Sequence, residues 1–127
     1  MATEAPALML PGCTSVSDNS SKQFYAVAVG TANDFTVDVV AGVGAVTIGI
    51  LQNNPKAGAA AEVATAGLSK AVSHGTITAG DLLMTYSDGT LETYSAGSNH
   101  YIVGTAMQSA VIGDTFSVHL GSKGPNA

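Results

Sequence analysis

The sequence predicts an all-β protein: a single small domain of β-sandwich or barrel-like form with an extended N-terminal arm. From residue 23 onward, short β-prone runs are separated by glycine, asparagine and aspartate at the close spacing typical of sandwiches and barrels. Several of these runs also alternate apolar and polar residues, as strands with one buried face do. A chain of 127 residues has the length of one domain and leaves no room for two independent cores.

Residues 1–22 are expected to form the arm. Pro6 and Pro11 interrupt any regular period there, and a polar run at residues 15–21 separates them from the first predicted strand. Between the prolines, residues 7–10 form a short apolar plug that water solvates poorly. The plug either packs back onto its own domain or docks on a neighbouring molecule, and the sequence leaves both alternatives open.

The β-rich domain is expected over residues 23–121, followed by a flexible C-terminal tail over residues 122–127. Nine segments qualify as its strands: 24–29, 35–40, 45–51, 62–65, 68–72, 82–86, 90–94, 101–107 and 115–120. In the second segment Phe35, Val37 and Val39 alternate with polar residues, and the last segment shows the same alternation, so each is expected to have one wet face. The third segment is apolar or small on both faces, which is typical of a central strand.

Three turns are predicted from neighbouring glycine and aspartate residues. Asp88-Gly89 lies between two β-prone runs and suits the positive φ angles of a type I′ turn, so we expect a hairpin there. Gly80-Asp81 and Gly113-Asp114 each lie just before a predicted strand, where glycine permits a tight backbone and aspartate accepts hydrogen bonds from turn amides. We therefore expect these last two aspartates to cap similar turns and to play no part in acid–base catalysis.

The composition excludes several classes of function. Charged residues make up 10% of the chain, against roughly 25% in an average soluble domain. With four lysines, no arginine and a net charge of −5, the chain lacks the main source of affinity for nucleic acid and the forked side chain that nucleotide enzymes commonly use. No apolar run approaches the roughly 20 residues that span a bilayer. We therefore expect no nucleic-acid partner and no membrane partner, whereas a neutral surface favours association with other proteins.

No constellation in the sequence points to catalysis, a metal or a cofactor. His74, His100 and His119 lie in different predicted elements, without the close pairing typical of metal sites. The single cysteine, Cys13, excludes an internal disulfide and lies in the arm without a neighbouring base, which leaves its role open. We expect a protein that is not an enzyme. The alternative that one sequence leaves open is an active site shared between subunits, in which a histidine meets an aspartate of a neighbour.

A distinctive order of motifs runs from about residue 43 to residue 120. The order is Gly49-Ile50-Leu51-Gln52-Asn53-Asn54-Pro55, Gly67-Leu68-Ser69-Lys70-Ala71-Val72, Ile77-Thr78-Ala79-Gly80-Asp81-Leu82-Leu83, Asp88-Gly89, Tyr101-Ile102-Val103-Gly104-Thr105-Ala106 and Gly113-Asp114-Thr115-Phe116-Ser117-Val118-His119-Leu120. In this order the motifs resemble the capsid decoration, or cement, proteins of tailed double-stranded DNA bacteriophages. Gly58-Ala59 stands where that family often carries Gly-Glu, and the arm matches no part of the family pattern.

The resemblance implies a non-enzymatic structural protein, located in the virion on the outer capsid surface after assembly in the host cytoplasm. It implies that the protein binds the phage head, stabilises contacts between subunits of the major capsid protein, and forms a homotrimer. The residues that we expect at protein interfaces lie in the arm and at the start of the first predicted strand: Leu8, Met9, Leu10, Phe24 and Tyr25. The alternative is a small β-sandwich carbohydrate-binding module of a phage surface structure, for which Tyr94 or Tyr101 would face solvent in a groove.

Overall fold

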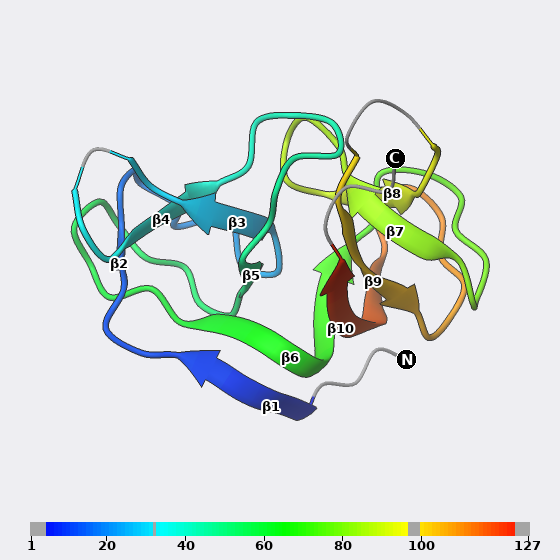
Figure 1. Cartoon of the computed structure of the whole chain (residues 1–127), viewed down its shortest axis with the longest axis horizontal. Helices are drawn as coiled ribbons and strands as arrows, with labels where there is room; N and C mark the ends of the chain where they lie inside the picture. Colours follow the sequence, from blue (N-terminus) through cyan, green and yellow to red (C-terminus); the bar gives the residue numbers. More distant parts are fainter. Residues whose placement is uncertain (1–4, 32, 97–99, 124–127) are drawn as a thin grey trace.

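The computed structural model describes residues 5–31, 33–96 and 100–123 (Figure 1). Every helix or strand within these residues is a β-strand, so the predicted all-β class is confirmed. The strands are β1 (Ala5–Leu10), β2 (Thr14–Ser15), β3 (Ala26–Val29), β4 (Thr36–Val39), β5 (Gly49–Leu51), β6 (Val63–Val72), β7 (Leu82–Thr85), β8 (Leu91–Thr93), β9 (Ile102–Ala106) and β10 (Thr115–Lys123). They form one sheet in the order β2-β4-β3-β5-β6-β10-β9-β7-β8, with β1 added to β6. Only β2 and β4 pair in parallel.

Strand β6 joins two half-sheets, because its two ends have different partners along the same edge. Val63 and Ala64 pair with β5, whereas residues 67–72 pair with β10. On its other edge, residues 63–68 of β6 pair with β1. Gly67 lies where the partner changes and has φ +92°, a left-handed conformation that favours glycine. Figure 1 shows β6 curving along one side of the molecule, with β1 beside it.

The position of Gly67 explains why two predicted strands, 62–65 and 68–72, are one strand in the structure. Glycine was expected to end a strand there, but its left-handed conformation bends β6 without interrupting the pairing. The first half-sheet therefore consists of β2, β4, β3 and β5, and the second of β10, β9, β7 and β8. Both half-sheets pair with β6, and two further backbone hydrogen bonds join them: the Ala26 N–H of β3 donates to the Gly89 carbonyl of the β7–β8 hairpin, and the Gly44 N–H donates to the Thr85 carbonyl of β7.

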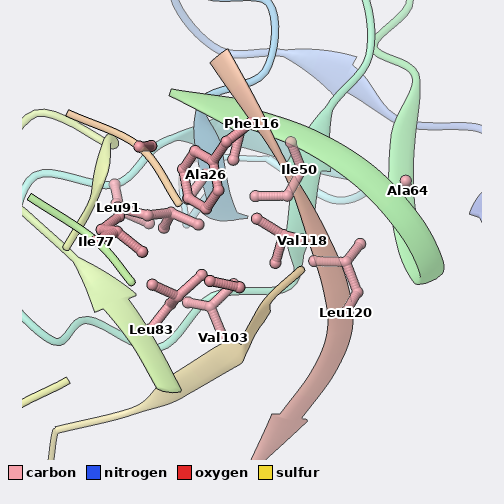
Figure 2. Packing of buried hydrophobic residues seen from close by; sticks show 14 residues of the cluster. Ala26, Ile50, Ala64, Ile77, Leu83, Leu91, Val103, Phe116, Val118 and Leu120 are labelled. Carbon is pink, nitrogen blue, oxygen red and sulfur yellow. The ribbon is translucent and has the colours of Figure 1, made fainter. Parts of the chain in front are cut away.

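The larger core cluster is built by residues of both half-sheets. In Figure 2, Ala26 and Ile50 of the first half-sheet lie close to Leu83, Val103 and Phe116 of the second. The smaller cluster includes the sequence neighbours of several of these residues: Val27, Leu51 and Val63, together with Cys13, Val37 and Ala61. Because successive residues of a strand point to opposite faces, the first half-sheet is apolar on both faces. This agrees with the interpretation of the segment containing β5 as a central strand.

The segment expected to be an arm contributes two strands to the sheet. Strand β1 pairs antiparallel with β6, and the buried Cys13 belongs to the smaller core cluster. The backbone of the apolar plug therefore pairs with its own domain, since β6 offers it an edge that would otherwise leave backbone groups unpaired, while the side chains of Leu8 and Met9 stay exposed. At the other end, β10 continues through Lys123, beyond the expected domain boundary at residue 121. The remainder of the expected tail, 124–127, lies outside the described residues.

The two Gly-Asp turns have the same geometry, as predicted. The Asp81 carboxylate accepts a hydrogen bond from the Thr78 N–H at 2.9 Å, and the Asp114 carboxylate accepts one from the Val111 N–H at 3.0 Å. The glycines before them have φ +95° and +86°. Each aspartate therefore caps its turn just before a strand, and these hydrogen bonds account for both carboxylates without invoking catalysis.

The two turns are also related by a local two-fold pattern of backbone pairing. Ile77 and Ala110, three residues before the two turn glycines, exchange hydrogen bonds of 2.8 and 3.0 Å. Ser73 lies four residues before Ile77 and pairs with the turn before β10, while Ala106 lies four residues before Ala110 and pairs with the turn before β7. The segment after β6, which leads into the turn before β7, thus pairs with the turn before β10. In the same way, the end of β9, which leads into the turn before β10, pairs with the turn before β7.

The hairpin predicted at residues 88–89 is present, but its turn differs from the predicted type. Strands β7 and β8 pair antiparallel, and Gly89 has φ +89°, whereas Asp88 has no positive φ. The Gly89 N–H donates to the Tyr86 carbonyl, and the Tyr86 N–H donates to the Thr90 carbonyl. This pattern is a three-residue loop with a glycine bulge, which requires only one positive φ angle.

Several strands begin later than the sequence predicts, and at β4 and β5 the difference leaves an apolar side chain exposed. Phe35 has φ +54° and is 75% exposed, so β4 begins at Thr36 and the predicted alternation fails at Phe35. Strand β5 begins only at Gly49, because the preceding segment crosses to β7, where the Thr85 hydroxyl donates to the Gly42 carbonyl and accepts from the Ala45 N–H. Val46 is consequently exposed.

The close approach of β5 to β6 predicts that Gly49→Ala destabilises the fold. A Cβ atom at position 49 would lie 2.3 Å from the Ala64 carbonyl oxygen, which is backbone and cannot move aside freely. We expect the free energy of unfolding in urea to fall by about 3 kcal/mol. Gly75→Ala is the matched control, because a Cβ there meets nothing within 4 Å, and its effect should stay within about 0.5 kcal/mol. Equal stability of the two variants would contradict this description of the β5–β6 contact.

Candidate functional site

The histidine, cysteine and acidic side chains in the described part of the chain form no cluster that could hold a metal ion. No three histidine, cysteine, aspartate or glutamate residues gather where they could hold a metal ion within residues 5–31, 33–96 and 100–123. The His100 ring nitrogen Nδ1 lies 2.8 Å from the Ser95 carbonyl oxygen, and His119 is exposed on β10. Nor does any helix in the same residues have the length and apolarity needed to cross a membrane.

His74 is held against the β7–β8 hairpin. Its ring stacks on Tyr86 with 3.4 Å between centroids, and the His74 backbone N–H donates to the Leu91 carbonyl. In the same hairpin, partial desolvation of Asp88 would raise the pKa of its carboxyl, but hydrogen bonds from the hydroxyl and N–H of Thr90, with the charge of His74, outweigh it and lower that pKa. These contacts stabilise the turn and form no open site for a substrate.

The five residues predicted at protein interfaces are divided among different surroundings. Leu8 and Met9 of β1 are exposed, by 62% and 44%. Leu10 is half-buried against the smaller core cluster, and Phe24 packs against the larger one with φ +72°. Tyr25 is half-buried, with the Lys22 ammonium 4.8 Å from the centre of its ring. Leu8 and Met9 are therefore the two whose side chains are most available to a partner.

The structure also exposes an apolar hollow that the sequence did not indicate. It measures about 460 Å³ and opens beside the β3–β4 hairpin. We call it the apolar hollow; its apolar walls are Leu10, Cys13, Val29, Phe35, Val37 and Ile48. A second hollow, of about 580 Å³, shares two of these residues and adds Val46 and Tyr101. The sequence did not reveal the hollow because Phe35 fits the apolar–polar alternation of a strand with one buried face. In the structure its positive φ takes it out of the strand and leaves its side chain exposed on the wall of the hollow.

A second apolar feature that sequence reasoning missed is the end of the turn before β10. Val111 and Ile112, here called the apolar tip, are 56% and 67% exposed. The turn was predicted correctly from Gly113 and Asp114, but the prediction did not include the two β-branched residues before them. Comparing the two Gly-Asp turns could have found them, since the turn before β7 carries Thr78 and Ala79 at the same positions.

The four tyrosines occupy separate environments. Tyr86 stacks on His74, and Tyr25 lies beneath Lys22. The Tyr94 hydroxyl is buried without a hydrogen-bond partner among the described residues, while Tyr101 is half-buried beside the second hollow. Tyr101 therefore lies beside a hollow, as the carbohydrate-binding alternative expects of Tyr94 or Tyr101. The contacts of the other three tyrosines leave Tyr101 as the one tyrosine of the four that could stack on a sugar there.

Comparison with known proteins finds similarity in three dimensions. The sequence matches no protein-family model and no curated protein. Among solved structures, the fold is similar to the N-terminal base of the head fiber protein gp8.5 of bacteriophage phi29, with a TM-score of 0.71 and 16% identity. The match covers 90% of this chain and 95% of the phage structure. At this level of identity the likeness shows a shared fold across nearly the whole of both chains.

The contacts of Asp88 predict a specific acid sensitivity. Because its pKa is lower in the folded protein than the ordinary 3.8, ionised Asp88 stabilises the fold above that value and loses this contribution as the pH falls through the folded pKa. We expect the melting temperature to fall less on acidification in Asp88→Asn than in the wild type. An NMR titration should also show the Asp88 pKa rising toward 3.8 in Thr90→Val. An unchanged Asp88 titration in Thr90→Val would contradict the role given to that hydroxyl.

Proposed function

We propose that this protein is a capsid decoration protein, which binds the outer surface of a phage head and stabilises contacts between subunits of its major capsid protein. The observation that carries the proposal is the likeness of the fold to the base of a phage head fiber protein over nearly the full length of both chains. The order of motifs described above supports the same role independently, because it was recognised from the sequence. On this proposal the protein is not an enzyme and acts in the virion.

The surface chemistry suits a role in binding other proteins. Only 10% of the residues are charged, so contact with a partner desolvates few ions, whose burial without a counter-charge is costly. Leu8 and Met9 are exposed on β1. A decoration protein is present in many copies, so modest contacts of this kind add into strong binding once the geometry lets them act together.

Strand β1 would make this contact through its side chains and not by adding a strand to a partner sheet. Pro6 lacks an N–H, and the pairing of β1 with β6 shifts register on either side of Leu8. Proline and bulges are the devices by which natural edge strands avoid pairing with other chains. Leu8 and Met9 are therefore the proposed contact with the capsid, while Leu10 packs against the smaller core cluster, Phe24 packs against the larger one, and Tyr25 is half-buried. The homotrimer implied by the resemblance is part of the proposal.

Cosedimentation with expanded phage heads that lack this protein tests the proposal. The heads come from the phage whose genome encodes the sequence, and the purified protein is titrated to saturation. We expect saturable binding at a fixed ratio to the major capsid protein, and heads that withstand heating better once saturated. Absence of binding at about micromolar concentration would contradict the proposal.

Replacement of the two exposed residues of β1 tests the proposed contact. We expect Leu8→Ser with Met9→Ser to weaken binding to heads by at least about tenfold, because the two side chains lose the apolar area they would bury. Both residues are exposed, so the melting temperature should change little. Val43→Ser, at another exposed apolar position, is the matched control and should bind like the wild type. Equal binding by the double variant would remove β1 from the contact.

A further inference from the structure

The apolar tip has no role within its own chain. Its two side chains are exposed, and the hydrogen bonds of the turn come from Gly113, Asp114 and the backbone. The equivalent turn before β7 provides an internal control, because it has the same aspartate cap and glycine conformation. That turn carries Thr78 and Ala79 at the corresponding positions, so the turn geometry does not require Val111 and Ile112. Two adjacent exposed β-branched residues therefore point to a contact outside the chain.

The apolar hollow is complementary to the tip in size and polarity. A cavity of about 150 Å³ holds a benzene molecule, so a hollow of about 460 Å³ has room for two aliphatic side chains. Val29 and Phe35 on its wall are exposed, although both are apolar. Tip and hollow together account for four of the eleven large apolar side chains exposed among the described residues.

Each of the two surfaces has one carboxylate beside it. No charged residue occurs between Met107 and Gly113, but Asp114 follows the tip and accepts a hydrogen bond from the Val111 N–H at 3.0 Å. Among the described residues, Asp34 is the one charged residue around the hollow. Both aspartates are exposed, so a contact made by the apolar side chains leaves both carboxylates in water.

The tip cannot fill the hollow of its own chain. Figure 1 places β2 and β4 at one end of the long axis of the molecule, and the turn before β10, drawn in orange, toward the other end. We propose that the apolar tip of one copy inserts into the apolar hollow of a second copy. Such a contact joins two different surfaces, so each copy offers one tip and one hollow. Repeating the contact from copy to copy gives a closed ring if the rotation between neighbours adds up to a full turn. This inference gives a contact to the homotrimer of the proposed function, but it is tested on the purified protein alone, whereas binding to the capsid is tested with phage heads.

Complementation between two variants tests this head-to-tail contact by sedimentation velocity. The tip variant, Val111→Thr with Ile112→Ala, copies the residues of the equivalent turn and so keeps the turn geometry. The hollow variant, Val29→Glu, places a charge on the exposed wall shared by the neighbouring hollows. We expect the wild type to associate and each variant alone to be monomeric, with self-association weakened at least about thirtyfold. Their equimolar mixture should form a one-to-one dimer, because one intact tip and one intact hollow remain.

A composition-matched variant distinguishes this contact from general stickiness. It carries Val111→Thr and Ile112→Ala together with Thr78→Val and Ala79→Ile, which moves the apolar pair to the equivalent turn. The specific contact predicts that this variant remains monomeric. A monomeric wild type, a swapped variant that associates as the wild type does, or a mixture of tip and hollow variants that forms no dimer would each overturn the proposal. Circular dichroism melting of every variant confirms that the fold is intact.

Discussion

Pairing of β6 with three other strands is the constraint on which the rest of the structure depends. Its outer edge holds β1, and its inner edge holds β5 near the start and β10 beyond Gly67. The change of partner needs a bend in a continuous strand, which the left-handed conformation of Gly67 supplies. With the bend in place, residues of both half-sheets meet in one core around Phe116 and Ile50 (Figure 2). Loss of the β6 pairing would therefore disrupt the core as well as the sheet.

This architecture explains why so many small, neutral residues are compatible with a stable domain. The first half-sheet contributes buried apolar side chains to both core clusters, and close backbone approaches at Gly49 and Gly104 leave no space for a side chain. Backbone pairing and short side chains therefore replace the ion pairs and long charged residues of an average domain. The apolar residues that remain exposed include pairs on β1, at the β3–β4 hairpin and at the turn before β10. A protein that binds through these surfaces has little charge to desolvate.

Local features of the fold could be predicted from the sequence, whereas contacts between distant segments could not. The Gly-Asp turns, the hairpin and the buried face of β10 follow from neighbouring residues, and the structure confirms them. The pairing of β1 with β6 joins residues nearly sixty positions apart, so composition alone left the plug without a partner. The conformation of Phe35, the apolar hollow and the exposure of Val46 depend on crossings between strands. For the five predicted interface residues, the local sequence therefore showed which side chains are apolar. It could not show which of them are exposed.

The central claim is that this domain acts by covering the outside of a phage head. An electron cryomicroscopy difference map between heads with and without the bound protein tests it most directly. The account predicts density of the size of this domain on the outer surface, at positions shared by neighbouring capsid subunits, with β1 facing the shell. Density confined to the inside of the shell, to the tail or to a single vertex would contradict the account.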